Sequence, residues 1–285
     1  MSELRKAMND QMLLKGFSEP TKKCYLAAVR LLAQHYHLSP DKLSHEDIQN
    51  WFLYLLKEHH VAPATCRAYL HALRFFYCQV LEWNQFDIKF KIPKKKQKIP
   101  DLLSPSDVRL IIEHATTLKY RTAFIICYTC GLRLSEVTSL EIAHIHSEEH
   151  YLQVVQGKGF KDRNVPLPLS TIQALREYWQ AYRPKRFLFP NRDGYKPISV
   201  TCFQKNFAQS KSSAGITKIG GIHGLRHAFA THQLRAGMPI HQLKIVLGHT
   251  DIKTTERYLH WCPQSGEGGS NIDLLQHLVG GQADE

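Results

Sequence analysis

Residues 221–260 of this 285-residue chain read GIHGLRHAFATHQLRAGMPIHQLKIVLGHTDIKTTERYLH. Apolar residues recur at helical intervals over residues 224–236 and again over residues 240–247, so the stretch predicts two helices. Histidine, arginine and tyrosine residues are spread along the same helices and the segments beside them, and they make this stretch the starting point for a chemical interpretation.

Four of these side chains are candidates for acid–base or ionic chemistry. His223 lies three residues before Arg226, so both can point to one side of a helix start. His249 follows in the segment Leu-Gly-His-Thr, and Tyr258 comes nine residues after it. His227 directly follows Arg226, so we expect it to point to another face of the helix and to have a structural role.

Two further motifs lie upstream, Gly-Leu-Arg-Leu-Ser-Glu around Arg133 and Gly-Lys-Gly-Phe-Lys-Asp-Arg around Lys158. Arg133 and Arg226 are permanent planar cations suited to hold one phosphate group. Phosphoryl transfer needs such charges next to the non-bridging oxygens. It also needs a nucleophile, such as the Tyr258 hydroxyl, and an acid for the leaving oxygen, such as Lys158. These residues together can cleave a phosphodiester without a metal ion.

In their order and spacing, the four motifs resemble the tyrosine recombinase (phage integrase) family. The resemblance covers about residues 10–262 and is closest over residues 221–260. The short N-terminus has no obvious arm-binding domain of the lambda-integrase type, so the chain looks like a simple two-domain, Xer-like or mobile-element integrase. The resemblance implies a site-specific DNA recombinase that works through a 3′-phosphotyrosyl intermediate and a Holliday junction, with no cofactor.

The resemblance also implies a role for each residue. Tyr258 attacks the scissile phosphate, and Arg133 and Arg226 stabilise the pentacoordinate transition state. His249 adds a hydrogen-bond donor, and His223 assists proton transfer to or from Tyr258.

The remaining roles follow in the same way. Lys158 is the general acid for the departing 5′ hydroxyl, with Lys161 as its rival for that position, and Glu136 supports the site. The family further implies double-stranded DNA with paired, inverted-repeat core sites as partner, and a homotetramer on DNA that is a monomer when free.

Two other functions share part of this pattern. A type IB topoisomerase-like nicking-closing enzyme uses the same chemistry, although the compact spacing of this chain favours an integrase. A DNA-binding protein that has kept the fold and lost catalysis is the second alternative, and the complete set of six catalytic positions argues against it.

The fold class expected is mainly α, with a helical, SAM-like core-binding domain and a mixed α/β catalytic domain that contains a small three-stranded antiparallel sheet. Helices are predicted over residues 21–36, from Ser44 onward and over residues 63–81, and a catalytic-domain helix starts at Ser104. Short strands are predicted near residues 145, 151–156 and 163–167. The expected divisions are a core-binding domain (1–86), a basic linker (87–100), a catalytic domain (101–262) and a tail (263–285).

The net charge of +12 indicates a polyanionic partner and is unevenly distributed. The linker holds six lysines, including Lys94, Lys95 and Lys96, which either lie along a DNA backbone or act as a solvated spacer. The candidate DNA-binding residues are Arg67, His71 and Arg74 on one helix face, the three linker lysines, and Lys161. The helix face has an alternative interpretation as ordinary solvated surface.

The acidic tail contains an apolar segment, residues 271–278, behind a Gly-rich tether. We expect this segment either to dock on a neighbouring protomer or to pack on its own domain.

Composition excludes several classes of protein. No window approaches 18 consecutive apolar residues, which argues against a membrane span, and the start of the chain shows no secretory signal. Seven scattered cysteines indicate reduced thiols in a cytoplasmic protein. The resemblance to tyrosine recombinases implies a bacterial protein that associates with the nucleoid when it is bound to DNA. Pairs such as Cys127 with Cys130 and His144 with His146 are weak metal candidates, and we expect no metal site.

Overall fold

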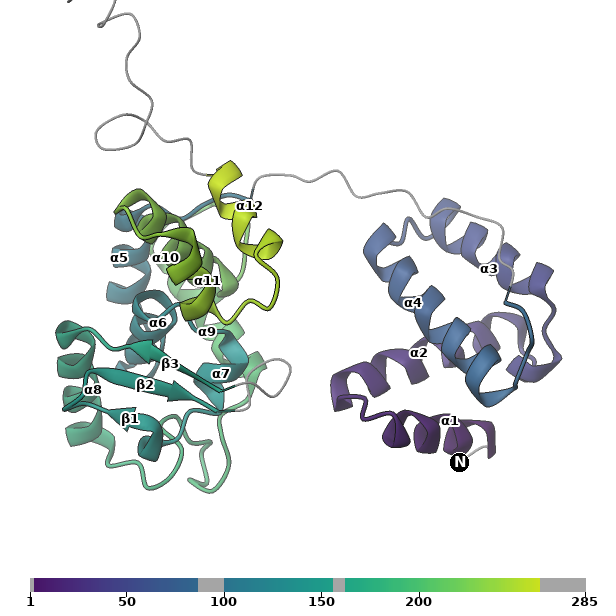
Figure 1. Ribbon diagram of the computed structural model, residues 1–285, viewed down its shortest axis with the longest axis horizontal. Coiled ribbons are helices and arrows are strands. Elements are labelled where there is room, and N and C mark those ends of the chain that lie inside the picture. The colour runs from purple at the N-terminus through teal and green to yellow at the C-terminus, as the bar shows by residue number, and fades with distance from the viewer. Residues whose placement is uncertain (1–2, 87–99, 156–161, 262–285) are drawn as a thin grey trace, which may run out of the picture. The chain divides into compact units, whose positions relative to one another are not determined.

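The structure, a computed structural model, describes residues 3–86, 100–155 and 162–261. The chain divides into two compact units, residues 1–98 and 99–285, each with its own hydrophobic core (Figure 1). Within the described residues the fold is mostly helical with one three-stranded antiparallel sheet, which confirms the expected fold class. None of the described helices is both long and apolar enough for a membrane crossing.

The described part of the N-terminal unit consists of helices. They are α1 (Glu3–Leu14), α2 (Glu19–Tyr36), the 3-10 helix η1 (Pro40–Lys42), α3 (His45–Lys57), α4 (Pro63–Phe75) and the π-helix η2 (Phe76–Val80). Ser44 and Asp47 form a capping box that starts α3, as their spacing predicts. Helix α1 was not predicted, because its sequence is largely polar. Its Met8 and Met12, one turn apart, are buried in the core.

The helix expected over residues 63–81 is present from Pro63 to Val80, but the chain changes from α to π geometry at Phe76. The π-helix has more residues per turn, and both Phe76 and Tyr77 are buried there. The hydroxyl of Tyr77 donates to the carbonyl of Pro40 at 2.7 Å, which ties this turn to η1.

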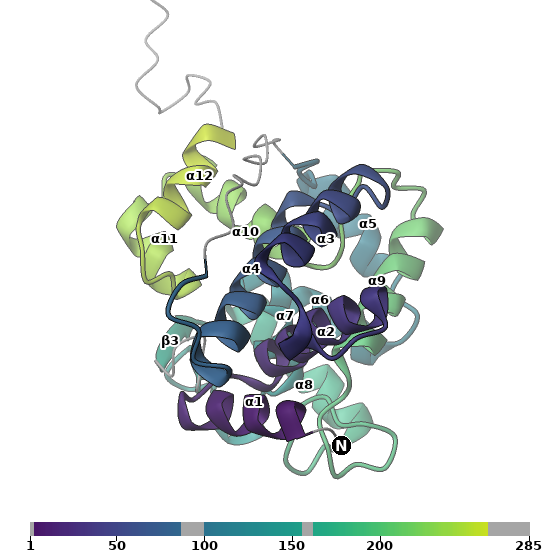
Figure 2. The same cartoon turned by 90° about the vertical axis from the view of Figure 1, so that its right-hand side faces the viewer.

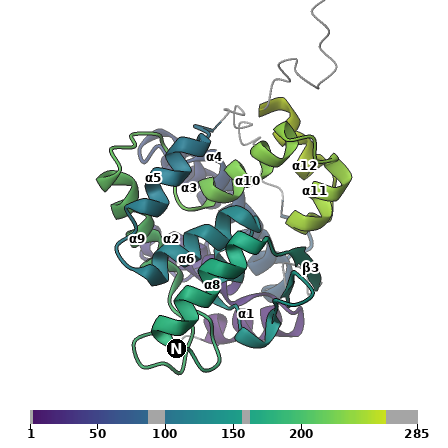
Figure 3. The same ribbon diagram turned by 90° about the vertical axis from the view of Figure 1, so that its left-hand side faces the viewer.

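The C-terminal unit combines a small sheet with helices (Figure 1). Its elements are α5 (Pro105–Glu113), α6 (Leu118–Thr129), α7 (Leu134–Thr138), η3 (Ile142–His144), β1 (Ile145–His146), β2 (Tyr151–Val154), β3 (Arg163–Pro166), α8 (Leu169–Tyr182), α9 (Val200–Ser213), α10 (His223–Arg235), α11 (Ile240–Leu247) and α12 (Lys253–Trp261). The strands run antiparallel in the order β1-β2-β3, with Leu152 opposite Val165, and α11 lies against β3 (Figure 3).

Helix α10 packs against four other helices of this unit (Figure 2). It contacts α5 and α6, which precede the sheet in the sequence, and α11 and α12, which follow α10. Gly131 makes the close approach of α6 to α10 possible. It has φ +59°, and a Cβ atom there would lie 2.3 Å from the ring of Phe229 on α10. The Gly131 turn therefore places the residues after it directly beside α10.

Candidate active site

Arg226 is the deeply buried cation of the site, with its side chain 2% exposed. Its Nη1 donates to the carbonyl of Gly131 at 2.8 Å, and its Nη2 donates to the carbonyl of Leu247 at 2.6 Å. Leu247 is the last residue of α11, where the helix dipole concentrates negative charge. Burial, followed by repulsion from Arg133, lowers the pKa of Arg226 to about 10. The guanidinium group therefore stays charged at neutral pH.

Glu136 lies at the centre of a group of guanidinium side chains. It accepts hydrogen bonds from Nη1 and from the backbone N–H of Arg133, both at 2.8 Å. Arg163 binds the same carboxylate through two N–H groups, each at 2.9 Å. Burial alone would raise the pKa of Glu136, but hydrogen bonds and charge from Arg163, and then from Arg133, hold it at about 2. Glu136 is therefore fully ionised.

Three guanidinium groups surround the single carboxylate of Glu136. Arg226 lies 3.9 Å from Glu136, in addition to the direct ion pairs of Arg133 and Arg163 with the same group. The Glu136 charge balances only one of these three cations. The surplus of positive charge suits an anionic phosphodiester that approaches from solvent and gains further negative charge in the transition state.

His249 is held between Arg226 and α12. Its Nε2 lies 3.1 Å from Nη2 of Arg226, and its Nδ1 lies 2.9 Å from the hydroxyl of Thr255. Gly248, at φ +62°, ends α11 and turns the chain so that His249 faces the arginines. Burial, and then repulsion by Arg226, lowers the pKa of His249 to about 4, so the ring is neutral at pH 7.

Tyr258 on α12 is buried against these groups and is 2% exposed. Its ring lies parallel to that of His249 at 6.4 Å and meets the Trp261 ring edge-on at 5.1 Å. Its hydroxyl lies 3.0 Å from Nδ1 of His227. Burial raises the pKa of Tyr258, and the positive charge of Arg226 partly offsets that rise.

His227 is expected to point to another face of α10 than Arg226 and to be structural, yet its Nδ1 lies 3.0 Å from the Tyr258 hydroxyl, so it is part of the site. His227 follows His223 by four residues, so both rings lie on one face of α10, with their centroids 4.6 Å apart. His223 is exposed at the start of the helix, whereas His227 is partly buried beside Tyr258. This four-residue spacing was the signal that could have identified His227 from the sequence.

Arg133 and His223 both line a cavity next to the site. The cavity has a volume of about 560 Å³ and is also lined by Ser135 and Lys211. Arg133 is 21% exposed, so it connects the buried Arg226 to the surface. Partial desolvation of its ring, followed by repulsion from Arg226 and Arg133, lowers the pKa of His223.

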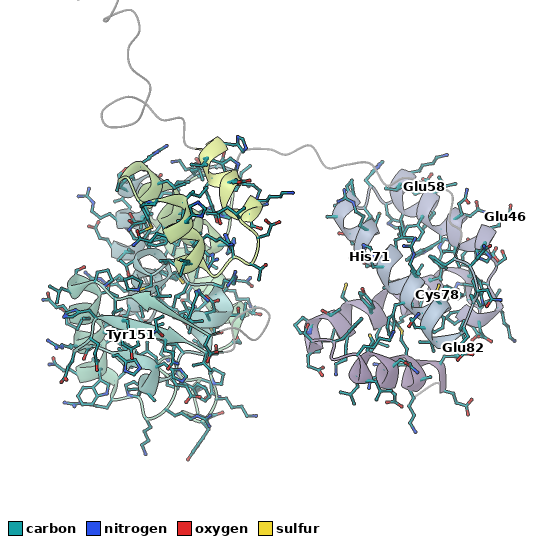
Figure 4. All side chains as sticks on the ribbon, in the orientation of Figure 1. Glu46, Glu58, His71, Cys78, Glu82 and Tyr151 are labelled. Carbon is teal, nitrogen blue, oxygen red and sulfur yellow. The ribbon has the colours of Figure 1, made fainter. Side chains whose placement is uncertain are left out.

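Lys158, Lys161 and the linker lysines Lys94, Lys95 and Lys96 fall outside the described residues, as does the tail. Arg67, His71 and Arg74 are all exposed on α4 of the N-terminal unit, where Figure 4 marks His71.

Within the described ranges, no group of three or more His, Cys, Asp or Glu side chains is placed to hold an ion. Cys127 and Cys130 are both buried in the core of the C-terminal unit. Burial raises the pKa of each thiol to about 12, which disfavours the thiolate form that a metal ion needs.

Comparison with known proteins gives a consistent result for both units. The profile of the Phage integrase family matches residues 101–264, and the profile of the Phage integrase N-terminal SAM-like domain matches residues 4–85. A putative integrase/recombinase, y4qK, of Sinorhizobium fredii is 37% identical over 91% of this chain and 84% of its own length. A tyrosine recombinase of Thermosipho africanus is 31% identical over 88% of this chain and 92% of its own length.

The fold also matches solved structures. The lambda integrase tetramer bound to a Holliday junction superimposes with a TM-score of 0.70 at 14% identity, over 95% of this chain and 80% of that one. At this identity the match concerns the fold alone.

Proposed function

The chain belongs to the phage integrase family of tyrosine recombinases, enzymes that cleave and rejoin DNA at specific sites, and from this premise we propose that Tyr258 is its nucleophile. The observation that carries the proposal is that the Tyr258 hydroxyl is buried beside Arg226 and His249 in the same subunit. A tyrosine that is buried among cations and neutral imidazoles is placed to attack a phosphate held by those cations.

In the proposed reaction, the Tyr258 oxygen bonds to the scissile phosphorus and the bond to the 5′ oxygen breaks. Arg226 and Arg133 then stabilise the charge that develops on the non-bridging oxygens. Both guanidinium groups are already fixed by backbone carbonyls, Arg226 by Gly131 and Leu247 and Arg133 by Gly248. Because they are fixed before DNA arrives, they need little reorganisation during the reaction.

His249 is proposed to donate a hydrogen bond to the phosphate. In the free protein Nη2 of Arg226 can only donate, so Nε2 of His249 accepts from it and the ring proton is on Nδ1, which donates to the Thr255 hydroxyl. The donor role requires the other tautomer. When a phosphate oxygen takes the N–H of Arg226, the Nε2–H of His249 can donate to the same phosphate while the Thr255 hydroxyl donates to Nδ1.

Lys158 is proposed as the general acid that protonates the leaving 5′ oxygen, a role that rests on its place in the family motif. The same motif ends at Arg163, which is bound to Glu136 inside the site. Glu136 and Arg163 are proposed as positioning residues, because they orient Arg133 and bind the backbone of α11 without access to the phosphate.

The proposed substrate is double-stranded DNA with paired, inverted-repeat core sites, bound by four copies of this chain. The lambda integrase tetramer on a Holliday junction, which shares the fold, supports this arrangement. The face of α4 formed by Arg67, His71 and Arg74, together with Lys161 and the linker lysines, is proposed to contact the DNA backbone. Such a substrate places the protein in the bacterial cytoplasm, on the nucleoid.

A covalent-capture experiment tests the nucleophile. The full chain is incubated with a pool of nicked duplexes made from the DNA that flanks its gene and from randomised sequence, and protein-linked DNA is isolated and sequenced. We expect adducts at a defined site in the wild type and none with Tyr258→Phe. An adduct that persists in Tyr258→Phe would reject Tyr258.

The same sites then separate recombination from simple nicking and closing. Two duplexes of different length that both contain the captured site are incubated with the protein. Recombinant products of mixed length are expected from a recombinase, whereas adducts without mixed products would indicate a topoisomerase-like activity.

A further inference from the structure

The path of the chain into α10 depends on a short segment with little conformational preference of its own. This entry segment, residues 218–222, lies between α9 and His223, the first residue of α10. It contains Gly220 and Gly221, and Gly220 adopts φ +142°, a conformation that residues with a side chain rarely take. A Cβ at either glycine would meet nothing within 4 Å. Packing at the glycines therefore does not fix the segment.

Two charged side chains fix it instead. Nζ of Lys211, near the end of α9, donates to the backbone carbonyls of Lys218 and Gly220, the second at 3.1 Å. The backbone N–H of Ile219 donates to a carboxylate oxygen of Asp101 at 2.9 Å. Hydrogen bonds in which one partner is ionised are roughly twice as strong as those between neutral groups. Three successive residues of the entry segment are therefore bound by charged groups from elsewhere in the unit.

The side chain of Lys218 connects the same segment to the start of the C-terminal unit. Its Nζ donates to the carbonyl of Leu102 at 2.9 Å and forms an ion pair with Asp107. Burial alone would raise the pKa of Asp107, but Lys218, and then Ser104, hold it below its ordinary value. The ion pair therefore stays charged at neutral pH, and it joins the entry segment to the first turn of α5.

The position of His223 depends on this segment. The ring of His223 contacts that of His227, with centroids 4.6 Å apart, and none of the hydrogen bonds within the described residues involves its side chain. His223 lines the cavity next to the site together with Arg133 and Lys211. Because hydrogen bonds do not hold the ring, it follows its backbone, and a movement of the entry segment would move His223 relative to Arg133.

We propose that Lys211 and Asp101 are positioning residues for DNA cleavage, because they hold the entry segment and thereby place His223 beside the phosphate that Arg133 binds. The proposal rests on the proposed function, in which that phosphate is the reacting group. Lys211 and Asp101 act through the backbone of residues 218–220 and have no need to touch the reacting atoms. Loss of either side chain should leave DNA bound and slow the reaction, since a misplacement of about 1 Å can cost about 10²-fold in rate.

Amide hydrogen exchange in the DNA-free protein tests whether the two side chains hold the segment. We expect the Ile219 amide to exchange about 3- to 10-fold faster in Lys211→Met and in Asp101→Ala, because each variant lacks hydrogen bonds that fix the segment. Lys211→Arg keeps a cation that can donate to the same carbonyls and should exchange at nearly the wild-type rate. Lys205→Met, exposed on α9, and Glu177→Ala, exposed on α8, are the controls for the loss of a charge. Unchanged exchange of Ile219 in Lys211→Met would overturn the proposal.

The rate of adduct formation at saturating DNA tests whether the segment positions the site. This rate should fall by about 10- to 100-fold in Lys211→Met and in Asp101→Ala, and Lys211→Arg should restore it. The affinity for DNA should not fall in these variants, and the two controls should react at the wild-type rate. If Asp101→Ala also reacted at the wild-type rate, the proposal would fail.

A direct contact of Lys211 with DNA would give a different result. Lys211→Met would then lower the slope of log K against log salt by about 0.9 and leave both the rate at saturating DNA and the exchange of Ile219 unchanged, which would reject the positioning role. Failure of the proposed nucleophile is recognised separately, because adducts would then persist in Tyr258→Phe. The rates at which the Lys211 and Asp101 variants form those adducts would still decide whether the two residues position the site.

Discussion

Arg163 and Glu136 form a fork-to-fork pair in the C-terminal unit, with two parallel N–H to carboxylate hydrogen bonds of 2.9 Å. Nε of the same arginine donates to the carbonyl of Val246 at 2.8 Å. One side chain at the start of β3 thereby joins α7, which carries Glu136, to α11, which leads into His249. The pair is buried, and it links three segments that are far apart in the sequence.

Glu136→Gln should destabilise the C-terminal unit. The substitution leaves three guanidinium groups around a neutral amide, and the loss of one member of a buried ion pair costs about 3–5 kcal/mol. Urea unfolding at pH 7 measures the change. Glu141→Gln is the control, because Glu141 pairs with an exposed arginine, Arg186, and such surface pairs contribute about 0–1 kcal/mol. If both variants lost the same free energy of unfolding, the buried Glu136 would stabilise the unit no more than a surface carboxylate.

The contribution of Glu136 to stability should depend on pH. Its pKa is depressed to about 2 in the folded state, from an ordinary value of 4.5, so the folded state binds the proton less tightly. The stabilisation is therefore complete above about pH 5 and is lost as the pH falls toward 2, with a total on the order of 3 kcal/mol. The free energy of unfolding is measured from pH 7 to pH 2 for the wild type and for Glu136→Gln. The difference between the two values should become smaller as the pH falls through that window. A constant difference would show that Glu136 titrates normally.

Much of this arrangement was accessible from the sequence because its signals are local. The capping boxes at Ser44 and Ser104, the Gly131 turn and the three strands follow from residues that are close together in the chain. The motif around Arg133 likewise contains its own partner, since Glu136 lies one turn further along α7.

The features that were missed depend on tertiary contacts. Nothing near Arg163 in the sequence indicates that it binds a carboxylate 27 positions earlier, since the pairing exists only once β3 lies against α11. His227 was assigned to another face because it was compared with Arg226 next to it, whereas the relevant neighbour, Tyr258, comes from α12. The helix α1 was overlooked because packing against α2 and η2, rather than its own pattern, stabilises it.

Gly131→Ala should be strongly destabilising. The position has φ +59°, which costs an L-residue about 1–2 kcal/mol, and the new Cβ would lie 2.3 Å from the ring of Phe229. The clash would push α10 away and displace Arg226 from the Gly131 carbonyl. The midpoint temperature of thermal unfolding and the rate of adduct formation should both fall. Gly215→Ala is the matched control, because Gly215 has φ +70° and a Cβ there would meet nothing within 4 Å. This variant should be destabilised only by the backbone strain.

Neutralising the exposed face of α4 should weaken DNA binding in a salt-dependent way. Arg67→Gln/Arg74→Gln removes two cations from one helix face, and the loss of each cation that binds a phosphate should reduce the slope of log K against log salt by about 0.9. Titration of the captured DNA site at several salt concentrations measures this. Arg5→Gln/Arg30→Gln removes two exposed cations from α1 and α2 of the same unit and should leave the slope unchanged. Equal effects would indicate a general charge effect instead of a binding face.

The linker lysines give a second salt-dependence prediction that is independent of α4. If Lys94, Lys95 and Lys96 each bind a phosphate, their replacement by Gln should reduce the salt slope by about 2.7 in total, because each neutralised phosphate releases its condensed counterions. Lys185→Gln/Lys196→Gln removes exposed charges from the C-terminal unit and serves as control. The adduct rate at saturating DNA should be unaffected, because the linker lysines have no part in the chemistry. An unchanged slope would mean that the lysines act only as a solvated spacer between the two units.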